Sequence, residues 1–266
     1  MKKIITSVLL AGSLAMMNGC SKDGGINIFS VEDDIQLGLQ TKQQIEDDPA
    51  QFPILNPAAY PAVYAYIQAM RDDVLNSGKV IHKDQFPWEI KIIQRDDVVN
   101  AFCTPGGYIY IYTGLIKYLD HKSSLAGVLG HEMAHADKRH STNQLTKKYG
   151  VQTLLDVILG KNQNLLTQIG AELVSLRFSR TDESEADEYS VIYLCPIKYR
   201  ADGAADFFQK IIDQGNGNIP EFLSTHPNPD NRVQAIRDHA SSLGCATTIA
   251  PNEEDAGYQA FKNSLP

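Results

Sequence analysis

Apolar residues recur at helical spacing along most of this chain. Ile35, Leu39 and Ile45 mark an amphipathic segment that follows Ser30 and has acidic residues in its first turn, which favours a helix. From about residue 114 onward, almost every segment has the same helical character. The predicted helices span 31–48, 64–78, 114–120, 123–140, 141–160, 163–178, 180–195, 200–214 and 229–243.

Strand-like sequence is confined to one region. The segment 88–94 is strand-like, and Tyr108-Ile109-Tyr110-Ile111-Tyr112 is a run of strand formers. Pro105-Gly106-Gly107 is a turn sequence, so 97–103 and 108–113 should pair as a hairpin. A small sheet followed by many helices predicts an α+β fold, in which an edge-strand hairpin packs on a mostly helical bundle.

The N-terminus has the layout of a secretory signal peptide. Two lysines precede a mostly apolar run over 4–17, which is short for a membrane span, although an ordinary N-terminal membrane anchor is the alternative. Gly19-Cys20 resembles a bacterial lipobox, in which Cys20 becomes lipidated. Ser21 resembles the signal that sends lipoproteins to the outer membrane. The sequence therefore predicts a lipid-anchored protein of the bacterial cell envelope that faces the periplasm.

These features divide the chain of 266 residues into four parts. We expect a signal peptide at 1–19, a polar tether at 20–29, a single domain at 30–245, and a polar, loosely attached tail at 246–266. The domain is long enough to bury a sizeable core.

Charge and cysteine content narrow the classes of function. The net charge is −8, and cleavage before Cys20 would make it −10, which argues against a nucleic-acid partner. In an oxidising envelope, Cys195 and Cys245 would pair, since both follow predicted helices. The alternative is that these residues and Cys103 are small buried hydrophobic side chains.

The stretch GVLGHEMAHADKRH, at 127–140, carries the candidate chemistry. Residues four apart on a helix lie nearly above one another, so His131 and His135 can direct two imidazoles at one metal ion. Glu132 would then reach a water on that metal and act as the general base, which is the arrangement of zinc peptidases. The alternative is a helix that happens to contain two histidines. A third ligand elsewhere in the chain would favour the metal site over that alternative.

Acidic residues downstream could supply the third ligand. A catalytic zinc ion takes three protein ligands and keeps one position open. In SRTDESEADEYS, at 179–190, Glu183 and Asp187 share one helical face and Glu185 points away. We expect Glu183 to bind the metal and Asp187 to accept the N–H of a ligand histidine. Glu185 as the ligand, or a solvated acidic helix without a metal, are the alternatives.

Four motifs together resemble one family of zinc endopeptidases, that of HtpX and the CAAX prenyl proteases. They are HEMAH, ESEAD, the upstream NAFCTPGGYIYIYTGL and the downstream THPNPDNR, and the resemblance covers about residues 30–243. Within the family, the soluble envelope lipoprotein branch is the most similar. The resemblance implies a zincin-like fold of the minigluzincin type and one Zn²⁺ per chain.

The resemblance also implies roles for residues outside the histidine motif. His226 would donate a hydrogen bond to the oxyanion, or occupy a fourth metal position and hold the enzyme inactive. Arg232 would support the loop or the oxyanion. Plain surface roles, as a loop histidine and a helix-surface ion pair, are the alternatives.

A substrate strand is predicted upstream of the histidine motif. Asn100-Ala101-Phe102 resembles the substrate-binding edge of thermolysin-like enzymes, so 99–103 should line the cleft, with a plain core strand as the alternative. The other histidines have no partner pattern and are predicted to lie on the surface. They are His82, His121, His140 and His239.

The leading hypothesis is therefore a zinc-dependent endopeptidase that hydrolyses misfolded or misassembled envelope proteins. The resemblance, and not the residues alone, implies that quality-control role. Two other functions stay open: a zinc-stabilised periplasmic chaperone or assembly factor with little proteolysis, and a non-proteolytic zinc hydrolase.

Overall fold

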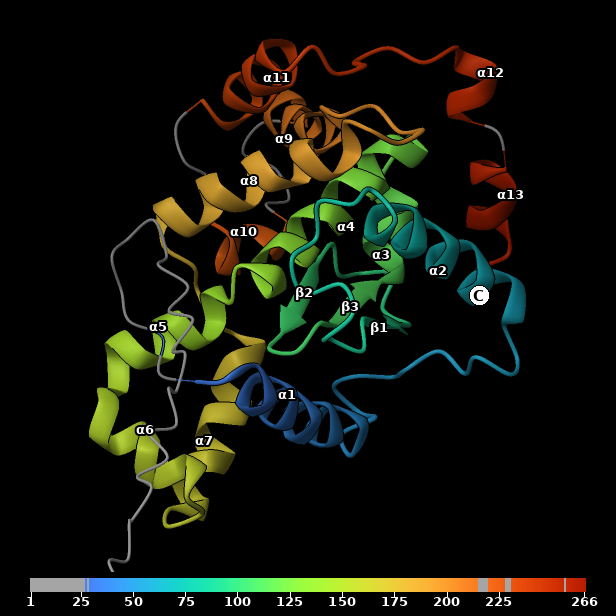
Figure 1. Cartoon of the computed structure of the whole chain (residues 1–266). Helices are drawn as coiled ribbons and strands as arrows, with labels where there is room; N and C mark the ends of the chain where they lie inside the picture. The colour runs from blue at the N-terminus through green and yellow to red at the C-terminus, as the bar shows by residue number, and fades with distance from the viewer. Residues whose placement is uncertain (1–26, 28, 215–219, 228–230, 256) are drawn as a thin grey trace, which may run out of the picture.

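The computed structural model describes residues 27, 29–214, 220–227, 231–255 and 257–266 (Figure 1). The predicted signal peptide and Cys20 lie outside the described residues. Within them, no helix combines the length and the apolar character needed to cross a membrane. The architecture is the predicted α+β arrangement, a small sheet among many helices. The helices before the sheet are α1 (Val31–Glu46) and α2 (Pro61–Leu75), and the strands are β1 (Glu89–Ile93), β2 (Ala101–Thr104) and β3 (Tyr108–Tyr112).

Helices make up most of the described chain after the sheet. They are α3 (Thr113–Tyr118), α4 (Lys122–Asp137), α5 (His140–Tyr149), α6 (Val151–Ile158), α7 (Gln163–Val174), α8 (Arg180–Leu194), α9 (Gly203–Gln214), α10 (Phe222–Thr225), α11 (Arg232–Ser242), α12 (Pro251–Glu254) and α13 (Tyr258–Asn263).

The sheet has the strand order β1-β3-β2, with β1 parallel and β2 antiparallel to the central strand. The predicted hairpin of β2 and β3 is therefore confirmed, and β2 is an edge strand. All five residues of β3 are buried, and because successive side chains of a strand point to opposite faces, both faces of the sheet are covered. Ile109 and Ile111 join the large core with α2 and α4, whereas the three tyrosines of β3 join a second cluster with Ile45 of α1.

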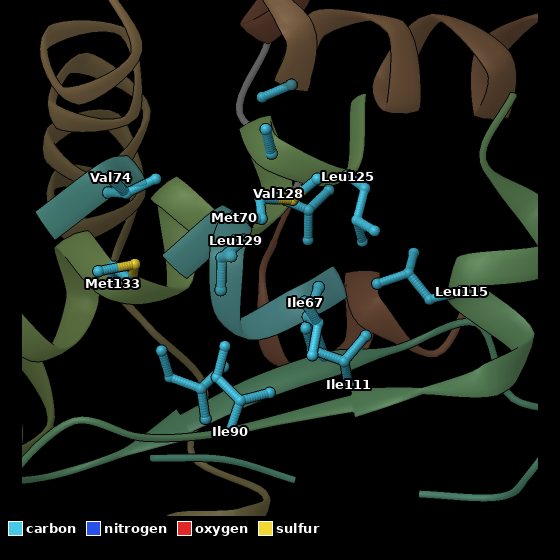
Figure 2. Packing of buried hydrophobic residues seen from close by; sticks show 14 of the residues in the cluster. Ile67, Met70, Val74, Ile90, Ile111, Leu115, Leu125, Val128, Leu129 and Met133 are labelled. Atoms are coloured by element: carbon cyan, nitrogen blue, oxygen red, sulfur yellow. The ribbon is translucent and has the colours of Figure 1, made fainter. Parts of the chain in front are cut away.

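Figure 2 shows how the large core forms between the sheet and α4. Ile67 and Met70 of α2 lie with Leu125 and Leu129 of α4 above the sheet, and all four are at most 1% exposed. Burial of this kind contributes about 1.5–3 kcal/mol for each large side chain. The core therefore holds α4, which carries the histidine motif, rigidly against the strands.

Close backbone packing also fixes α4 from its other side. A Cβ atom on Gly127 would lie 2.2 Å from the backbone nitrogen of Ala204, and one on Gly130 would lie 3.0 Å from Ser190 Oγ. The hydroxyl of Ser190 donates to the carbonyl of Gly127 at 2.8 Å. These small residues let α8 and α9 approach α4 closely, so α4 is buried from Ser123 to Asp137.

Two chain breaks differ from the predicted helices. The expected helix over 141–160 is two helices, because Gly150 takes a positive φ of 77° between α5 and α6. Arg139 also takes a left-handed conformation, with φ of 59°. Its guanidinium donates to the carbonyl oxygens of Phe29 and Ser30 and pairs with Asp34, which stabilises this turn after α4.

The C-terminal segment differs from the expectation of a loosely attached polar tail. Tyr258 and Phe261 of α13 are 0% and 4% exposed and belong to the large core. The hydroxyl of Tyr258 donates to the carbonyl oxygen of Ile116 at 3.1 Å, and Phe261 stacks on Tyr66 at 4.1 Å. The expectation of loose attachment was wrong, because a small number of apolar side chains in a polar sequence is enough to dock a short helix on the core.

The cysteine prediction is confirmed. Cys195, which follows α8, forms a disulfide with Cys245, which follows α11. Cys103 of β2 is a free, buried thiol. The bond closes a loop over a sequence separation of 50 residues, and it ties the C-terminal ends of α8 and α11 together.

Candidate metal centre

Four side chains from three segments converge beside α4. His131 and His135 project from one face of that helix, Glu183 comes from α8, and His226 follows α10. One nitrogen or oxygen of each lies within 4.8 Å of the others. His131 Nε2 and His135 Nε2 are 3.0 Å apart, and each is 3.4 Å from an oxygen of Glu183. The helical spacing of four residues therefore aims both imidazoles at one point, as the sequence predicts.

Glu132 lies next to this cluster without belonging to it. Its Oε1 is 3.4 Å from Nε2 of His226, yet neither carboxylate oxygen receives a hydrogen bond from an N–H or O–H group of the described residues. Burial raises the pKa of Glu132 above its ordinary value. Burial and the Glu132 carboxylate also raise the pKa of the Cys103 thiol well above its ordinary value, because a thiolate there would be desolvated and repelled.

Asp187 and Arg232 form a buried ion pair behind His131. Asp187 Oδ1 lies 2.9 Å from His131 Nδ1. Arg232 donates to both oxygens of Asp187, at 2.5 and 2.7 Å, and its Nη1 lies 3.0 Å from Glu183. Since Arg232 is 2% exposed, the alternative of a helix-surface ion pair for it was wrong. The pair fixes both the orientation of the His131 ring and the position of the Glu183 carboxylate.

The electrostatics of the centre favour an ionised Glu183. Burial alone would raise its pKa, but His226, Arg232 and the two motif histidines hold that pKa well below its ordinary value. Burial disfavours the charged ring of His131, yet hydrogen bonds with Asp187 and Glu183 raise its pKa to about 9. Burial lowers the pKa of His135 well below its ordinary value. The cluster thus holds an anionic oxygen among imidazoles, a donor set that suits zinc.

The centre is covered in this structure. His131 is 2% exposed, and Glu132, His135, Glu183 and His226 are fully buried. His226 Nδ1 lies 3.0 Å from Glu183 Oε1, and its ring stacks on Phe222 with centroids 4.2 Å apart. The alternative of a surface loop histidine was therefore wrong for His226. The rings of Phe222, His226 and Phe178 therefore pack against the motif histidines and help to bury them.

The predicted substrate strand runs beside the centre. Ala101 and Phe102 lie on the edge strand β2, directly after Asn100, and all three are buried. Ala101 and Cys103 face α4, whereas Phe102 stacks on Tyr110 on the opposite face, with centroids 4.7 Å apart. The Asn100 side-chain oxygen has no hydrogen-bond partner among the described residues.

Sequence reasoning missed the surroundings of His135. His140, predicted to lie on the surface, is fully buried, with its Nδ1 2.8 Å from His135 Nδ1. Glu185, the alternative metal ligand, lies 3.3 Å from the Nε2 of His140 and is not one of the four converging donors. Phe178 stacks on the His135 ring at 3.8 Å. The turn at Arg139 brings His140 back toward α4, and helical periodicity could not predict such a turn.

The other histidines differ in their surroundings. The side chain of His121 is 45% exposed, which agrees with the predicted surface position. His82 is only partly exposed, because its ring and backbone N–H bind the buried carboxylate of Asp137 at the end of α4. The ring of His239 is partly buried, with its Nε2 shielded from solvent. The surface prediction was therefore wrong for His82 as well as for His140.

The fold is a small sheet packed on helices. One helix supplies two histidines and a neighbouring glutamate, and another helix supplies a third donor. This is the arrangement of a metallopeptidase. The sequence model of peptidase family M48 matches residues 61–240. The chain therefore belongs to peptidase family M48.

Curated relatives agree with this family. The chain is 25% identical to the beta-barrel assembly-enhancing protease of Yersinia pestis over 263 residues, which cover 90% of this chain and 53% of that one. It is 31% identical to the mitochondrial metalloendopeptidase OMA1 of Arabidopsis thaliana over 58% of this chain and 32% of that one. It is 27% identical to the metalloprotease YcaL of Escherichia coli over 59% of this chain and 63% of that one. The chain thus spans between 32% and 63% of the length of these relatives.

Proposed function

We propose that this protein is a zinc-dependent endopeptidase. The observation that carries the proposal is the convergence of four buried donor atoms within 4.8 Å, with the carboxylate of Glu132 beside them. Family membership supports the same class of enzyme. Names that include metalloendopeptidase and metalloprotease, given to two relatives, agree with it.

His131, His135 and Glu183 would hold one Zn²⁺ per chain. Two imidazoles and a carboxylate are a common catalytic zinc set. The buried centre fits an ion because, among the described residues, no N–H or O–H group donates a hydrogen bond to either oxygen of Glu132, and His226 Nε2 has no hydrogen-bond partner. A bound zinc ion would supply Lewis-acid chemistry, by lowering the pKa of a water molecule and polarising the scissile carbonyl. Asp187 would keep the Nδ1 proton of His131 in place, which leaves Nε2 free to coordinate.

Glu132 would act as the general base and then as the acid. As an ionised carboxylate it accepts a proton from the attacking water, and it then gives that proton to the leaving amine. Its position supports this role, since the carboxylate lies against the donor cluster and receives no hydrogen bond from the described N–H and O–H groups. Burial raises its pKa, which makes it a stronger proton acceptor once it is ionised.

His226 would have two roles that depend on the position of its loop. In the closed arrangement its ring lies among the metal donors, where it can occupy a fourth position and keep the enzyme inactive. After residues 222–227 move, its N–H could donate to the oxyanion of the tetrahedral intermediate. Arg232 would support the reaction through Asp187 and Glu183, both of which it contacts.

The edge strand β2 would bind the substrate. An extended peptide that pairs with an edge strand is recognised through its main chain, so its sequence matters little. Ala101 and Phe102 lie at the start of this strand, directly after Asn100, and Cys103 of the same strand interacts with Glu132. A peptide added to this edge would therefore pass the proposed general base.

The cell envelope is the proposed location. Residues 1–20 resemble a lipoprotein signal, and one of the relatives compared above is a beta-barrel assembly-enhancing protease. We therefore propose misfolded or misassembled envelope proteins as substrates. A lipid on Cys20 would attach the protein to the outer membrane on its periplasmic side.

Casein cleavage tests the proposal directly. The purified chain should degrade casein, lose this activity to a chelator and recover it with zinc. Glu132→Gln should retain zinc but lose activity by about two to four orders of magnitude, since only the proton transfer is removed. Normal activity in zinc-loaded Glu132→Gln would contradict the base assignment. Binding without cleavage, in both wild type and His226→Ala, would instead indicate a chaperone.

A further inference from the structure

His140 lies between a proposed zinc ligand and a carboxylate, where packing alone does not require a histidine. Its Nδ1 is 2.8 Å from Nδ1 of His135, and its Nε2 is 3.3 Å from Oε2 of Glu185. The His140 side chain is fully buried. Both of its ring nitrogens therefore have partners, and one partner is the nitrogen of His135 that faces away from the metal donors.

These contacts admit one arrangement of protons when His135 coordinates through Nε2. A neutral imidazole that coordinates through Nε2 carries its proton on Nδ1. That Nδ1–H then donates to Nδ1 of His140, which must be unprotonated to accept it. The proton of His140 is therefore on Nε2, where it can donate to Glu185. The three side chains thus form a directional chain of hydrogen bonds that runs from His135 outward.

Local structure holds His140 in this position. α4 ends at Asp137, Arg139 takes φ of 59°, and α5 begins with His140 itself. In an uninterrupted helix, a residue five positions after His135 would point about 140° away from it. The turn corrects this direction, and the contacts of Arg139 with the carbonyl oxygens of Phe29 and Ser30 fix it.

We propose that His140, backed by Glu185, is a positioning residue that orients His135 for metal binding. The inference rests on the proposed function in one respect, that His135 coordinates through Nε2. His131 has a carboxylate, Asp187, in the corresponding place. The two ligand histidines are thus oriented by different groups, a carboxylate for His131 and a neutral imidazole for His135.

Two substitutions at one position separate orientation from packing. His140→Leu removes the acceptor for His135 and keeps an apolar side chain. His140→Asn places an amide oxygen close to the position of Nδ1 and can still accept the hydrogen bond. The matched control is His82→Leu, because His82 also bonds a buried side chain near the end of α4, at 3.0 Å from Asp137, but does not contact a proposed ligand.

The measurement is the zinc dissociation constant, obtained by competition with a chelating dye. Loss of such an outer partner typically weakens metal binding by about 10–100-fold, and we expect this for His140→Leu. His140→Asn should recover most of the affinity. His82→Leu should lower the thermal stability of the metal-free protein and leave the zinc affinity within about threefold of wild type, because its contacts lie outside the metal centre.

The inference is overturned if His140→Leu binds zinc as tightly as wild type, or if His140→Asn is as weak as His140→Leu. Glu185→Ala keeps His140 in place and provides a second measurement should His140→Leu fail to fold. It should weaken zinc binding by a smaller factor, and unchanged affinity would also count against the chain of hydrogen bonds. Zinc binding is measured apart from cleavage, so the two proposals can fail separately. If the variants show the expected order of zinc affinities but the wild type cleaves no protein, this inference is supported and the proposed activity is contradicted.

Discussion

Individual residues in this protein are defined by the partners that burial gives them. Glu132, Glu183 and Asp187 are all buried carboxylates. Asp187 is paired with an arginine and Glu183 lies among cationic and imidazole groups, so both have a lowered pKa. Glu132 receives no hydrogen bond from the described N–H and O–H groups, and burial raises its pKa. This separation of pKa values agrees with the separate roles proposed for these carboxylates, metal binding and proton transfer.

The raised pKa of Glu132 predicts the pH dependence of catalysis. Glu132 must be ionised to accept a proton, so kcat/KM should fall as the pH falls through its pKa. Because burial raises that pKa from the ordinary value of 4.5, the decline should lie above pH 4.5. The measurement is kcat/KM for a fluorogenic peptide against pH, with zinc content determined at each point. A decline at or below pH 4.5 in zinc-loaded enzyme would contradict this assignment.

At the scale of elements, the sequence predicted helices and strands well where periodicity decides them. The alternation of Ile and Tyr in 108–112 predicts a strand, and the structure shows that both faces of it are buried. The helices that carry the metal donors also begin and end close to their predicted bounds. Gly150 was missed as a break because it depends on a single residue with positive φ inside a continuous helical pattern. The break at Arg139 lies within two residues of the predicted boundary between 140 and 141.

The docking of α13 gives a prediction about stability. Tyr258 is fully buried, and truncation of a large buried aromatic side chain typically costs about 3–5 kcal/mol. Tyr258→Ala should therefore lower the free energy of unfolding by a few kcal/mol, as measured by urea denaturation of the metal-free chain. Gln259→Ala is the control. The side chain of Gln259 is exposed, so its removal should change the free energy of unfolding by less than about 0.5 kcal/mol. Equal stability of the two variants would show that the C-terminal segment is loosely attached after all.

On the scale of the whole molecule, the metal centre joins segments that are distant in the sequence. α4, α8 and the residue after α10 each supply donors, and α11 supplies the arginine that contacts Asp187. The sequence could indicate His131, Glu132 and His135 because their spacing is local. It could place Glu183 and Asp187 on one face, but the covering position of His226 and the turn that buries His140 depend on tertiary structure.

Joining distant segments predicts that zinc stabilises the fold. A ligand at about 1,000 times its dissociation constant stabilises the folded state by about 4 kcal/mol, which corresponds to a rise in Tm on the order of 10 °C for a chain of this size. Differential scanning fluorimetry should show this rise when zinc is added to chelator-treated protein. Glu132→Gln should keep the rise and His135→Ala should lose most of it. A Tm that does not respond to zinc in wild type would contradict the metal centre.

The disulfide between Cys195 and Cys245 encloses both His226 and Arg232 within one covalent ring. A peptide bond cut inside that ring, by the enzyme itself or by a contaminant, releases no fragment. Nicked molecules would run as intact chains on an electrophoresis gel until a reductant is added. A preparation in which the loop around His226 has been cut once can therefore pass for an intact one, because both pieces stay joined through the disulfide.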